Sequence, residues 1–566
     1  MKKVLLLTAA LVAAVLVWIR ATLPPQRLTL AKAGDGTIAG LLHIHTNRSD
    51  GLSSPDDVAA AAARAGLKFI VFTDHGDATR TPDPPQYRAG VLCLDGVEIS
   101  TNGGHYIAID MPASPYPLGG EASDVVEDVK RLGGFGVAAH PDSPKSQLRW
   151  TDWTAPIDGV ELLNLDTSWR ILAAQPGLAG KRRLVTALLD YPFRSVEVVT
   201  SLIQPPAILA QWAAVAAQRN VVMIAGADAH AKLLLPNADP QPGDFAPSFP
   251  GYDPSFRVMS VHVSVDRPLS NDAAADAALV TEAIRKGHLY TAIDGLASPP
   301  SFSLTGSNAS GTAGAGDVLS PAGAITLHVQ SNAPEGWTTV AHEGASILSA
   351  AASTQDLTVH GPNRPGVYWA EIVSNLGSPP ITWIRSNPVY VRATATPAPP
   401  SAQRAIAGSQ ALFDGASANG WRIEHDANSV GAVELAESGE TGTELRYRFG
   451  LAGGNAVGQF AALAYDLPAG TGEYDRVAFT LRSERPMRLS IQVRDTTADR
   501  WQKSIYVGES PQDRVVALDD LIPVGVTHAP RPERAAIRAL LVVMDTINTS
   551  PGTSSRLWIK RATLVR

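Results

Sequence analysis

The sequence predicts an α/β fold in which a closed β/α barrel is followed by two β-sandwiches. Between residues 36 and 295, short apolar segments alternate with helix-like segments, which is the pattern of a parallel sheet. About seven such repeats over roughly 260 residues favour closure of the sheet into a barrel. After Asp294 the apolar segments follow one another without helices between them, and this change predicts antiparallel sandwiches.

The barrel region begins with a strand expected at residues 41–45 and a helix after it. Ser54 is expected to cap this helix and Pro55 to occupy its first turn, while Gly66 ends it. Further helices are expected at residues 123–132, 206–219 and 272–286. Further strands are expected at residues 68–72, 91–99, 106–109, 135–139, 160–163, 221–225, 257–265 and 289–293.

The C-terminal part of the chain has the pattern of β structure alone. Residues 296–393 are expected to form an Ig-like sandwich, with strands at 324–330, 338–342 and 368–373. Residues 394–406 are rich in Pro, Ala, Ser and Thr and are expected to be a linker. Residues 407–566 are expected to form a second, jelly-roll-like sandwich, with strands at 444–449, 476–482, 489–494, 504–507 and 539–544.

The bulk composition limits the classes of protein to which the chain can belong. A length of 566 residues is enough for about three domains. The net charge of −7 gives no sign of binding to nucleic acid or to an anionic membrane. Cys93 is the one cysteine, which excludes an intrachain disulfide and a thiolate-rich metal site.

The first 23 residues have the pattern of an export signal. Lys2 and Lys3 precede an apolar run at residues 4–19, and Arg20 follows it. The run would be about 24 Å long as a helix, which is short of the ~30 Å apolar core of a bilayer. No clear small-residue cleavage site follows. We therefore expect an exported protein, periplasmic or extracellular, with residues 4–19 as a membrane tether; a cleaved signal is the alternative.

Residues that bind metal ions recur where the expected strands end. In a strand, alternate side chains share one face, so His43 and His45 are expected to point the same way. The C-terminal ends of barrel strands meet at one mouth, where active sites are built. The residues at such ends are His43, His45, His75, Glu98, His140, Asp228 and His230. Nitrogen and oxygen ligands without thiolate suit Zn²⁺, Mn²⁺ or Fe, and two such ions ~3.5–4 Å apart could share a hydroxide that attacks phosphorus or carbon.

Taken in order, the motifs resemble those of the PHP (polymerase and histidinol phosphatase) family over residues 36–295. They are His43-x-His45-Thr46-x-x-Ser49-Asp50-Gly51, Thr73-Asp74-His75, Gly96-Val97-Glu98, Ala139-His140-Pro141 and Asp228-Ala229-His230. The resemblance implies a distorted (β/α)7 barrel with two or three divalent metal ions, and phosphoesterase activity through a metal-bound hydroxide.

The resemblance also implies a ligand set, position by position. One ion would be held by His43, His45, Glu98 and Asp228. A second would share Glu98 and add His105 and His140, where Gly103-Gly104-His105 matches one branch of the family. A third would be held by Asp50, His75 and His230. Glu98 and Asp228 are therefore expected to be catalytic through the ions they hold.

The resemblance implies a basic residue that contacts substrate phosphate near the mouth. Arg257 is the candidate, and a solvent-exposed arginine at a strand start is the alternative. Arg48 is interpreted as a solvated loop charge, Lys181-Arg182-Arg183 as a solvated helix start, and Asp74 as support for its neighbour or for a strand end. Histidines outside the motifs are expected to be structural, as for His262 and His288, or on the surface, as for His328, His342, His360, His425 and His528. Trp421, Trp501 and Trp558 are expected in sandwich cores, although exposed aromatics could instead stack on sugars.

Three functions are compatible with these patterns. The first is an exported, metal-dependent hydrolase that acts as a phosphoesterase on small phosphorylated molecules. The second keeps the metal centre but cleaves a carbamate, ester or amide, and the scarcity of clear phosphate-binding basic residues favours it. The third is a surface binding protein whose sandwiches contact glycan or envelope partners, with the barrel as a scaffold.

Overall fold

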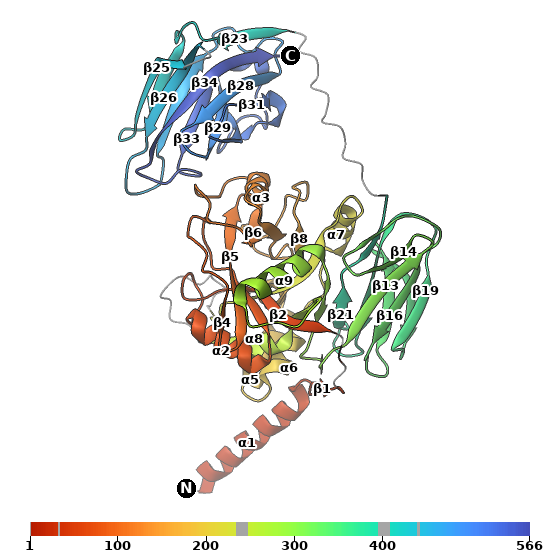
Figure 1. Ribbon diagram of the computed structural model, residues 1–566. Helices are drawn as coiled ribbons and strands as arrows, with labels where there is room; N and C mark the ends of the chain where they lie inside the picture. Colours follow the sequence, from red (N-terminus) through yellow and green to blue (C-terminus); the bar gives the residue numbers. More distant parts are fainter. Residues whose placement is uncertain (1, 32–33, 35, 234–246, 394–407, 439–441) are drawn as a thin grey trace. The chain divides into compact units, whose positions relative to one another are not determined.

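The computed structural model describes residues 2–31, 34, 36–233, 247–393, 408–438 and 442–566 (Figure 1). The expected linker at 394–406 lies outside these residues. The described chain forms two compact units. The first contains the barrel and the first sandwich, and the second has the C-terminal sandwich as its body.

A closed barrel forms the centre of the first unit, so the prediction of an α/β barrel is confirmed. Its strands pair in chain order, and the last strand pairs again with the first. All of these ladders are parallel except those on either side of β6, which are antiparallel. The barrel strands are β2 (Thr37–Ile44), β3 (Phe69–Phe72), β5 (Val91–Thr101), β6 (Gly104–Ile109), β7 (Phe135–Ala138), β8 (Gly159–Asn164) and β9 (Val222–Ala229).

Helices cover the outside of this barrel (Figure 1). The first of them follows the expected signals, because the Ser54 hydroxyl accepts the Asp57 N–H at 3.3 Å and Gly66 ends the helix at φ 89°. Placed after β2, it returns the chain to the start of β3. The helices are α2 (Pro55–Ala65), α3 (Ala122–Arg131), α4 (Leu165–Ala174), α5 (Ala179–Asp190), α6 (Ser195–Ser201), α7 (Leu209–Ala216), α8 (Tyr252–Val258) and α9 (Ala273–Lys286).

Three expected elements differ in the structure. The segment expected as a strand at 257–265 is the helix α8 followed by a shorter strand, β10 (Ser260–Ser264). A short apolar run does not distinguish helix from strand by periodicity, and here the helix buries Phe256 and Val258. Helix α3 begins at Ala122, before the expected cap at Ser123, and α7 is shorter than the helix expected at 206–219.

Strands β10 and β11 (Leu289–Ala292) lie outside the closed barrel and connect it to the first sandwich. Strand β10 pairs antiparallel with β2, β11 pairs with β10, and β11 pairs in turn with a sandwich strand, β21. One continuous apolar core joins the barrel and this sandwich, with Ile284 and Trp383 among its members. The two expected regions therefore share a sheet and a core.

The first sandwich has two sheets. One continues the barrel sheet through β15 (Val318–Leu319), β17 (Thr338–Glu343), β18 (Ser346–Ala352), β20 (Gly366–Val373), β21 (Thr382–Ser386) and β22 (Val389–Val391). The other contains β13 (Phe302–Asn308), β14 (Gly311–Gly314), β16 (Thr326–Ser331) and β19 (Asp356–His360). Short strands complete the unit: β1 (Leu28–Thr29) pairs with β12 (Ala297–Ser298), and β4 (Gln86–Arg88) pairs with β5.

The C-terminal sandwich is built as expected from two sheets around a core of its own. The first sheet contains β23 (Ser409–Phe413), β25 (Val430–Ser438), β26 (Gly442–Gly450), β28 (Arg476–Ser483), β31 (Gln512–Ala517) and β34 (Ser554–Val565). The second contains β24 (Trp421–His425), β27 (Phe460–Asp466), β29 (Met487–Asp495), β30 (Arg500–Val507), β32 (Ile522–Pro523) and β33 (Ile537–Asp545). Two single 3₁₀ turns accompany them, at Leu518–Asp520 and Arg534–Ala536.

Two expectations for side chains of the sandwiches are wrong. His342 was expected on the surface, but it is buried and stacks on Trp369 with ring centroids 3.9 Å apart. Trp421 and Trp501 are buried as expected, whereas Trp558 is only half-buried on the outer side of its sheet. The Arg482 guanidinium lies over the Trp558 ring, 4.1 Å from its centroid.

The N-terminal segment is the helix α1 (Lys2–Thr22). Several of its apolar side chains are exposed, among them Leu16 and Val17. Within the described residues, no helix combines the length and the apolar character that a membrane crossing requires. The tether at residues 4–19 stays a prediction.

Candidate metal centre

The barrel brings together all the ligands that the resemblance implies. They come from the C-terminal ends of β2, β5 and β9, from the start of β6, and from the loops after β2, β3, β7 and β9. Their side chains are buried except that of His75, which is about one-third exposed at 34%. Strands from opposite sides of the barrel thus contribute to one site.

Glu98 lies at the centre of this site. Its Oε2 atom is 3.2 Å from His43 Nε2, 3.2 Å from His45 Nε2 and 3.3 Å from His75 Nδ1. Oε1, the other carboxylate oxygen, is 2.8 Å from His105 Nδ1. The two oxygens therefore face different imidazoles, which is the arrangement of a carboxylate that can bridge two metal ions.

His140 completes the surroundings of the Glu98 carboxylate, because its Nε2 atom is 2.8 Å from Oε1. Asp228 faces two of the same imidazoles, with Oδ1 3.4 Å from His43 Nε2 and 3.3 Å from His45 Nε2. The carboxylates of Glu98 and Asp228 therefore share His43 and His45.

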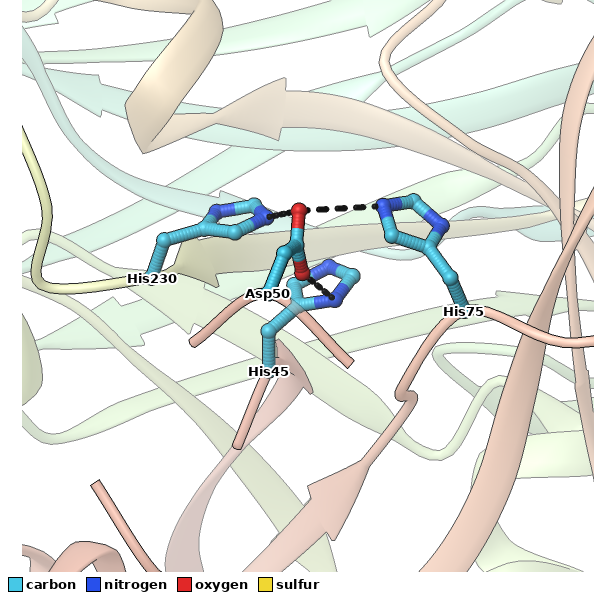
Figure 2. Close-up of side chains that lie close together, drawn as sticks. All are labelled: His45, Asp50, His75 and His230. Carbon is cyan, nitrogen blue, oxygen red and sulfur yellow. Dashed lines mark ion pairs between the residues drawn. The ribbon is translucent and has the colours of Figure 1, made fainter. Parts of the chain in front are cut away.

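Asp50 organises the outer part of the centre (Figure 2). Its Oδ2 atom is 3.1 Å from His230 Nε2 and 3.5 Å from His75 Nε2, while Oδ1 is 3.4 Å from His45 Nδ1. Figure 2 shows the three imidazoles directed at this carboxylate from separate strands and loops.

Within the described residues, three groups of ligand atoms are close enough to hold an ion, each with its atoms within 4.8 Å of one another. The first, His43, His45, Glu98 and Asp228, is the set that the resemblance implies. In the second, Asp50, His75 and His230 are joined by His45. In the third, Glu98 and His105 are joined by His75 rather than by His140.

The donor set fits metal ions, as the unpaired buried atoms show. Nε2 of His43, both ring nitrogens of His45 and Oε2 of Glu98 are buried without a hydrogen-bond partner. Leaving such atoms unpaired in a protein interior is costly, and an ion that accepts their lone pairs removes the cost. Nitrogen and oxygen donors in this combination suit Zn²⁺, Mn²⁺ or Fe.

The charges of the site reinforce one another. Burial acts to lower the pKa of His43, but the carboxylates of Glu161, Asp228 and Glu98 raise it well above the usual value. The pKa of His45 is raised in the same way by Asp228, Asp50 and Glu98 against the effect of burial. Burial would raise the pKa of Glu98, but the surrounding imidazoles hold it well below its usual range. Without an ion, the carboxylates therefore favour the protonated imidazoles of His43 and His45.

We expect metal binding at pH 7 to release protons. A histidine must be neutral to bind a metal ion, and the raised pKa values of His43, His45 and His140 keep protons there below those pKa values. Affinity should therefore rise as the pH rises. Calorimetric titration of Zn²⁺ in two buffers of different ionisation enthalpy should show roughly one or more protons released per ion. Equal heats in both buffers would contradict this expectation.

Glu161 in β8 supports the ligands, and sequence reasoning missed it. Its Oε1 is 2.8 Å from His43 Nδ1, and its Oε2 accepts the His140 N–H at 2.6 Å and an Asn164 Nδ2–H at 2.9 Å. A Cβ atom at position 226 would overlap this carboxylate, so Gly226 leaves the space for it. The available signal was one acidic residue inside the apolar strand expected at 160–163.

Replacing Glu161 by glutamine should weaken metal binding by roughly 10–100-fold, because the carboxylate that orients His43 and increases its basicity is lost. Competition with a fluorescent chelator measures the affinity. Glu434→Gln, which changes a partly exposed side chain of the C-terminal sandwich, is the matched control. Equal affinity of the two variants would show that Glu161 has no part in holding the ions.

The backbone of the site is unusual at three ligands. His43, His140 and Asp228 have positive φ values of 60°, 27° and 49°. Such values strain residues other than glycine and occur at functional sites. Strand β2 also shifts register between Leu41 and Ile44. His43 and His45 do share the site, but an irregular strand end brings them there rather than the regular alternation that the sequence predicts.

The Asp74 carboxylate holds the loop after β2 in place. It accepts the Thr46 N–H at 2.7 Å, the Thr46 hydroxyl at 2.8 Å and the Ser49 hydroxyl at 2.7 Å. The interpretation of Asp74 as a supporting residue is therefore confirmed. This loop carries Asp50, so the contacts fix that ligand in turn.

A cavity of about 490 Å³ opens beside the ligands. Among its described lining residues, Arg170 of α4 is the only permanent cation. Its guanidinium pairs with Asp166 and lies 4.9 Å from the centroid of the Trp169 ring. Sequence reasoning missed Arg170 because the helix that carries it, α4, was not among the expected helices. The remaining lining residues are Ser49, Asp50, His75, Glu98, Ser100, His105, His140, Gln147, Leu148, Asp166, Asp228 and His230.

Arg257, expected near the mouth, lies elsewhere. It is on α8, where its Nε is 2.9 Å from Asp253 Oδ2 and its Nη2 donates to the Arg64 carbonyl at 2.7 Å. Arg64 is at the end of α2, the helix that leads away from the mouth. The expected contact with substrate is therefore wrong, because the arginine was placed on a strand that is a helix. Arg48 pairs with Asp83 and Asp95 at the surface.

Comparison with known proteins identifies no family for this chain. No family model matches it. An uncharacterized protein of Methanocaldococcus jannaschii is 28% identical over 137 residues, which cover 22% of this chain and 80% of that protein. These comparisons therefore assign neither a family nor an activity to the chain.

Similar solved structures cover only part of the chain. A family 11 carbohydrate-binding module of a Clostridium thermocellum cellulase has a TM-score of 0.24 and 14% identity, covering 28% of this chain and 94% of that one. An exo-beta-agarase has a TM-score of 0.22 and 13% identity, covering 28% and 26%. Likenesses of this size carry no functional argument.

Proposed function

We propose that this protein is a metal-dependent hydrolase, and that it acts as a phosphoesterase on small phosphorylated molecules. The observation that carries the proposal is the buried Glu98 carboxylate, whose two oxygens face imidazoles on both sides at the edge of a cavity. The order of the motifs, which resembles that of the PHP family, supports it.

Each part of the site has a role in such a reaction. The ligands named above would hold two or three ions, with Glu98 shared between two of them. When bound, divalent ions activate water as a nucleophile and neutralise charge that develops on the substrate. Arg170 would orient a phosphoryl group by hydrogen bonds and charge. Asp166 and Trp169 hold the guanidinium in position for this contact. The cavity volume of about 490 Å³ suits a small molecule.

A second candidate is hydrolysis of a carbamate, ester or amide at the same centre. One observation favours it: Arg170, the only permanent cation among the described lining residues, is already paired with Asp166. A carbon-centred substrate develops less negative charge and needs fewer cations than a phosphate ester.

A panel of aryl substrates with the same leaving group tests the proposal. Protein loaded with Zn²⁺, Mn²⁺ or Fe²⁺ is assayed with an aryl phosphate, an aryl ester and an aryl carbamate, beside the Asp228→Ala variant. We expect turnover of the phosphate, lost by roughly 100-fold or more in the variant. Turnover of the ester or carbamate alone would select the second candidate. No turnover of any substrate, together with binding to polysaccharide, would favour a binding protein with glycan contacts through its sandwiches.

A further inference from the structure

The outward face of α5 is apolar. Leu178, Val185, Leu188, Leu189 and Phe193 are 72%, 57%, 40%, 54% and 57% exposed. At 100° per residue they fall on one side of the helix and of the residues that flank it. We call these five residues the α5 face. Exposed apolar side chains are usually scattered singly, whereas a group on one helix marks an interaction surface.

The other side of α5 packs against the neighbouring helices α4 and α6. Gly180, Ala187 and Asp190 are buried there, and Arg183 donates to the Ser201 carbonyl. A surface helix normally turns its large apolar residues to the core. In α5, Leu184 packs against the apolar cluster beneath the helix, whereas the larger apolar set faces outward.

Two basic residues border the α5 face. Lys181 and Arg182 are both exposed and lie on the same side, at the start of the helix. They are solvated, as the sequence predicts, but their neighbours are apolar rather than polar. Lysine and arginine beside an exposed apolar surface can keep their charges at headgroup level while the apolar side chains enter a lipid surface. The charge of −7 for the whole chain does not describe this local group.

A second helix with exposed apolar side chains, α1, ends beside the C-terminal end of α5 (Figure 1). The Thr22 hydroxyl at its end donates to Asp190 Oδ1 of α5 at 3.1 Å, and Arg194 Nη1 donates to the Pro24 carbonyl at 2.6 Å. Leu16 and Val17 of α1 are 61% and 70% exposed. A bilayer surface can cover two adjoining apolar helices at once without a matching shape.

We propose that the α5 face binds a lipid surface, with Lys181 and Arg182 in contact with anionic headgroups. The apolar side chains enter the boundary between headgroups and acyl chains, and the cations remain at headgroup level. The contact is independent of the metal centre, because none of these residues lines its cavity.

Sedimentation of the full chain with vesicles tests this contact. The vesicles contain phosphatidylcholine alone or mixed in equal parts with phosphatidylglycerol. The variant Val185→Asn, Leu188→Asn, Leu189→Asn removes part of the α5 face. The matched control, Val457→Asn, Val515→Asn, Val526→Asn, changes three side chains of the C-terminal sandwich that are at least as exposed. A further variant, Lys181→Gln, Arg182→Gln, removes the two positive charges. The wild type and the three variants are first compared by thermal unfolding.

We expect the first variant to bind mixed vesicles roughly tenfold or more weakly than wild type, and the control to bind like wild type. The Lys181→Gln, Arg182→Gln protein should lose most of the preference for phosphatidylglycerol, roughly tenfold. Equal binding of the α5 variant and wild type would overturn the proposal. The proposal would also be overturned if the wild type were a dimer without vesicles and only the α5 variant were a monomer. The α5 face would then join two copies of the chain.

Discussion

The Glu98→Gln variant should lose its metal ions, and its rate of hydrolysis should fall by roughly 10³-fold or more. The amide has the shape of the carboxylate but no charge, and only one of its two terminal atoms can donate a lone pair to an ion. The five imidazoles within 3.3 Å of the Glu98 oxygens would lose their common partner. Metal content by elemental analysis and turnover of an aryl phosphate measure the effect.

The Glu434→Gln variant controls for the chemical change, because that glutamate lies on the C-terminal sandwich far along the chain. Circular dichroism should show the barrel still folded in both variants. A Glu98→Gln protein that keeps its full metal content and turnover would show that this carboxylate does not bridge ions.

The Arg170→Met variant should lose roughly 100-fold in kcat/KM for an aryl phosphate while its metal content stays unchanged. Methionine retains an unbranched apolar stem beside Trp169 but cannot bind phosphoryl oxygens. The aryl ester, which carries no charge, should be affected much less. A difference between the two substrates separates substrate binding from damage to the site.

Arg257→Met is the matched control for that prediction, because Arg257 contacts Asp253 and Arg64 rather than the cavity. Equal losses on phosphate and ester in the Arg170 variant would assign Arg170 to structure alone. A larger loss in the Arg257 variant would restore the role that the sequence predicts for it.

Most ligands of the centre could be predicted from local sequence, whereas Asp50 and His105 came only from the family resemblance. His43, Glu98, His140 and Asp228 come at the ends of apolar runs, and the ends of barrel strands meet at one mouth. Metal binding could therefore be predicted without knowing which strands pair with one another. The three sets of ligand atoms that the structure brings together contain every predicted ligand except His140.

The residues that hold the ligands in place could not be predicted, because their contacts join positions that are far apart in the sequence. The Glu161 carboxylate contacts His43 across 118 residues, and nothing next to Glu161 in the sequence signals that contact. Arg170 is on a helix that periodicity did not separate from its neighbours. The positive φ of His43 likewise reflects a register shift in β2 that no propensity encodes.

The sheet that joins barrel and sandwich is a further case of non-local pairing. Strand β11 was expected as part of the barrel, but it pairs with β10 on one side and with β21 on the other. Its sequence is compatible with either position. The strands with which β11 pairs decide its position, and they lie before and after it along the chain.

The metal content of protein purified without chelator tests the central claim most directly. Elemental analysis of the full chain is set beside the variant Asp228→Ala, His230→Ala, which removes one ligand from each of two of the atom groups. We expect two or three equivalents of Zn, Mn or Fe in the wild type and a clear loss in the variant. Less than one equivalent in the wild type, with no uptake when Zn²⁺, Mn²⁺ or Fe²⁺ is added back, would contradict the account.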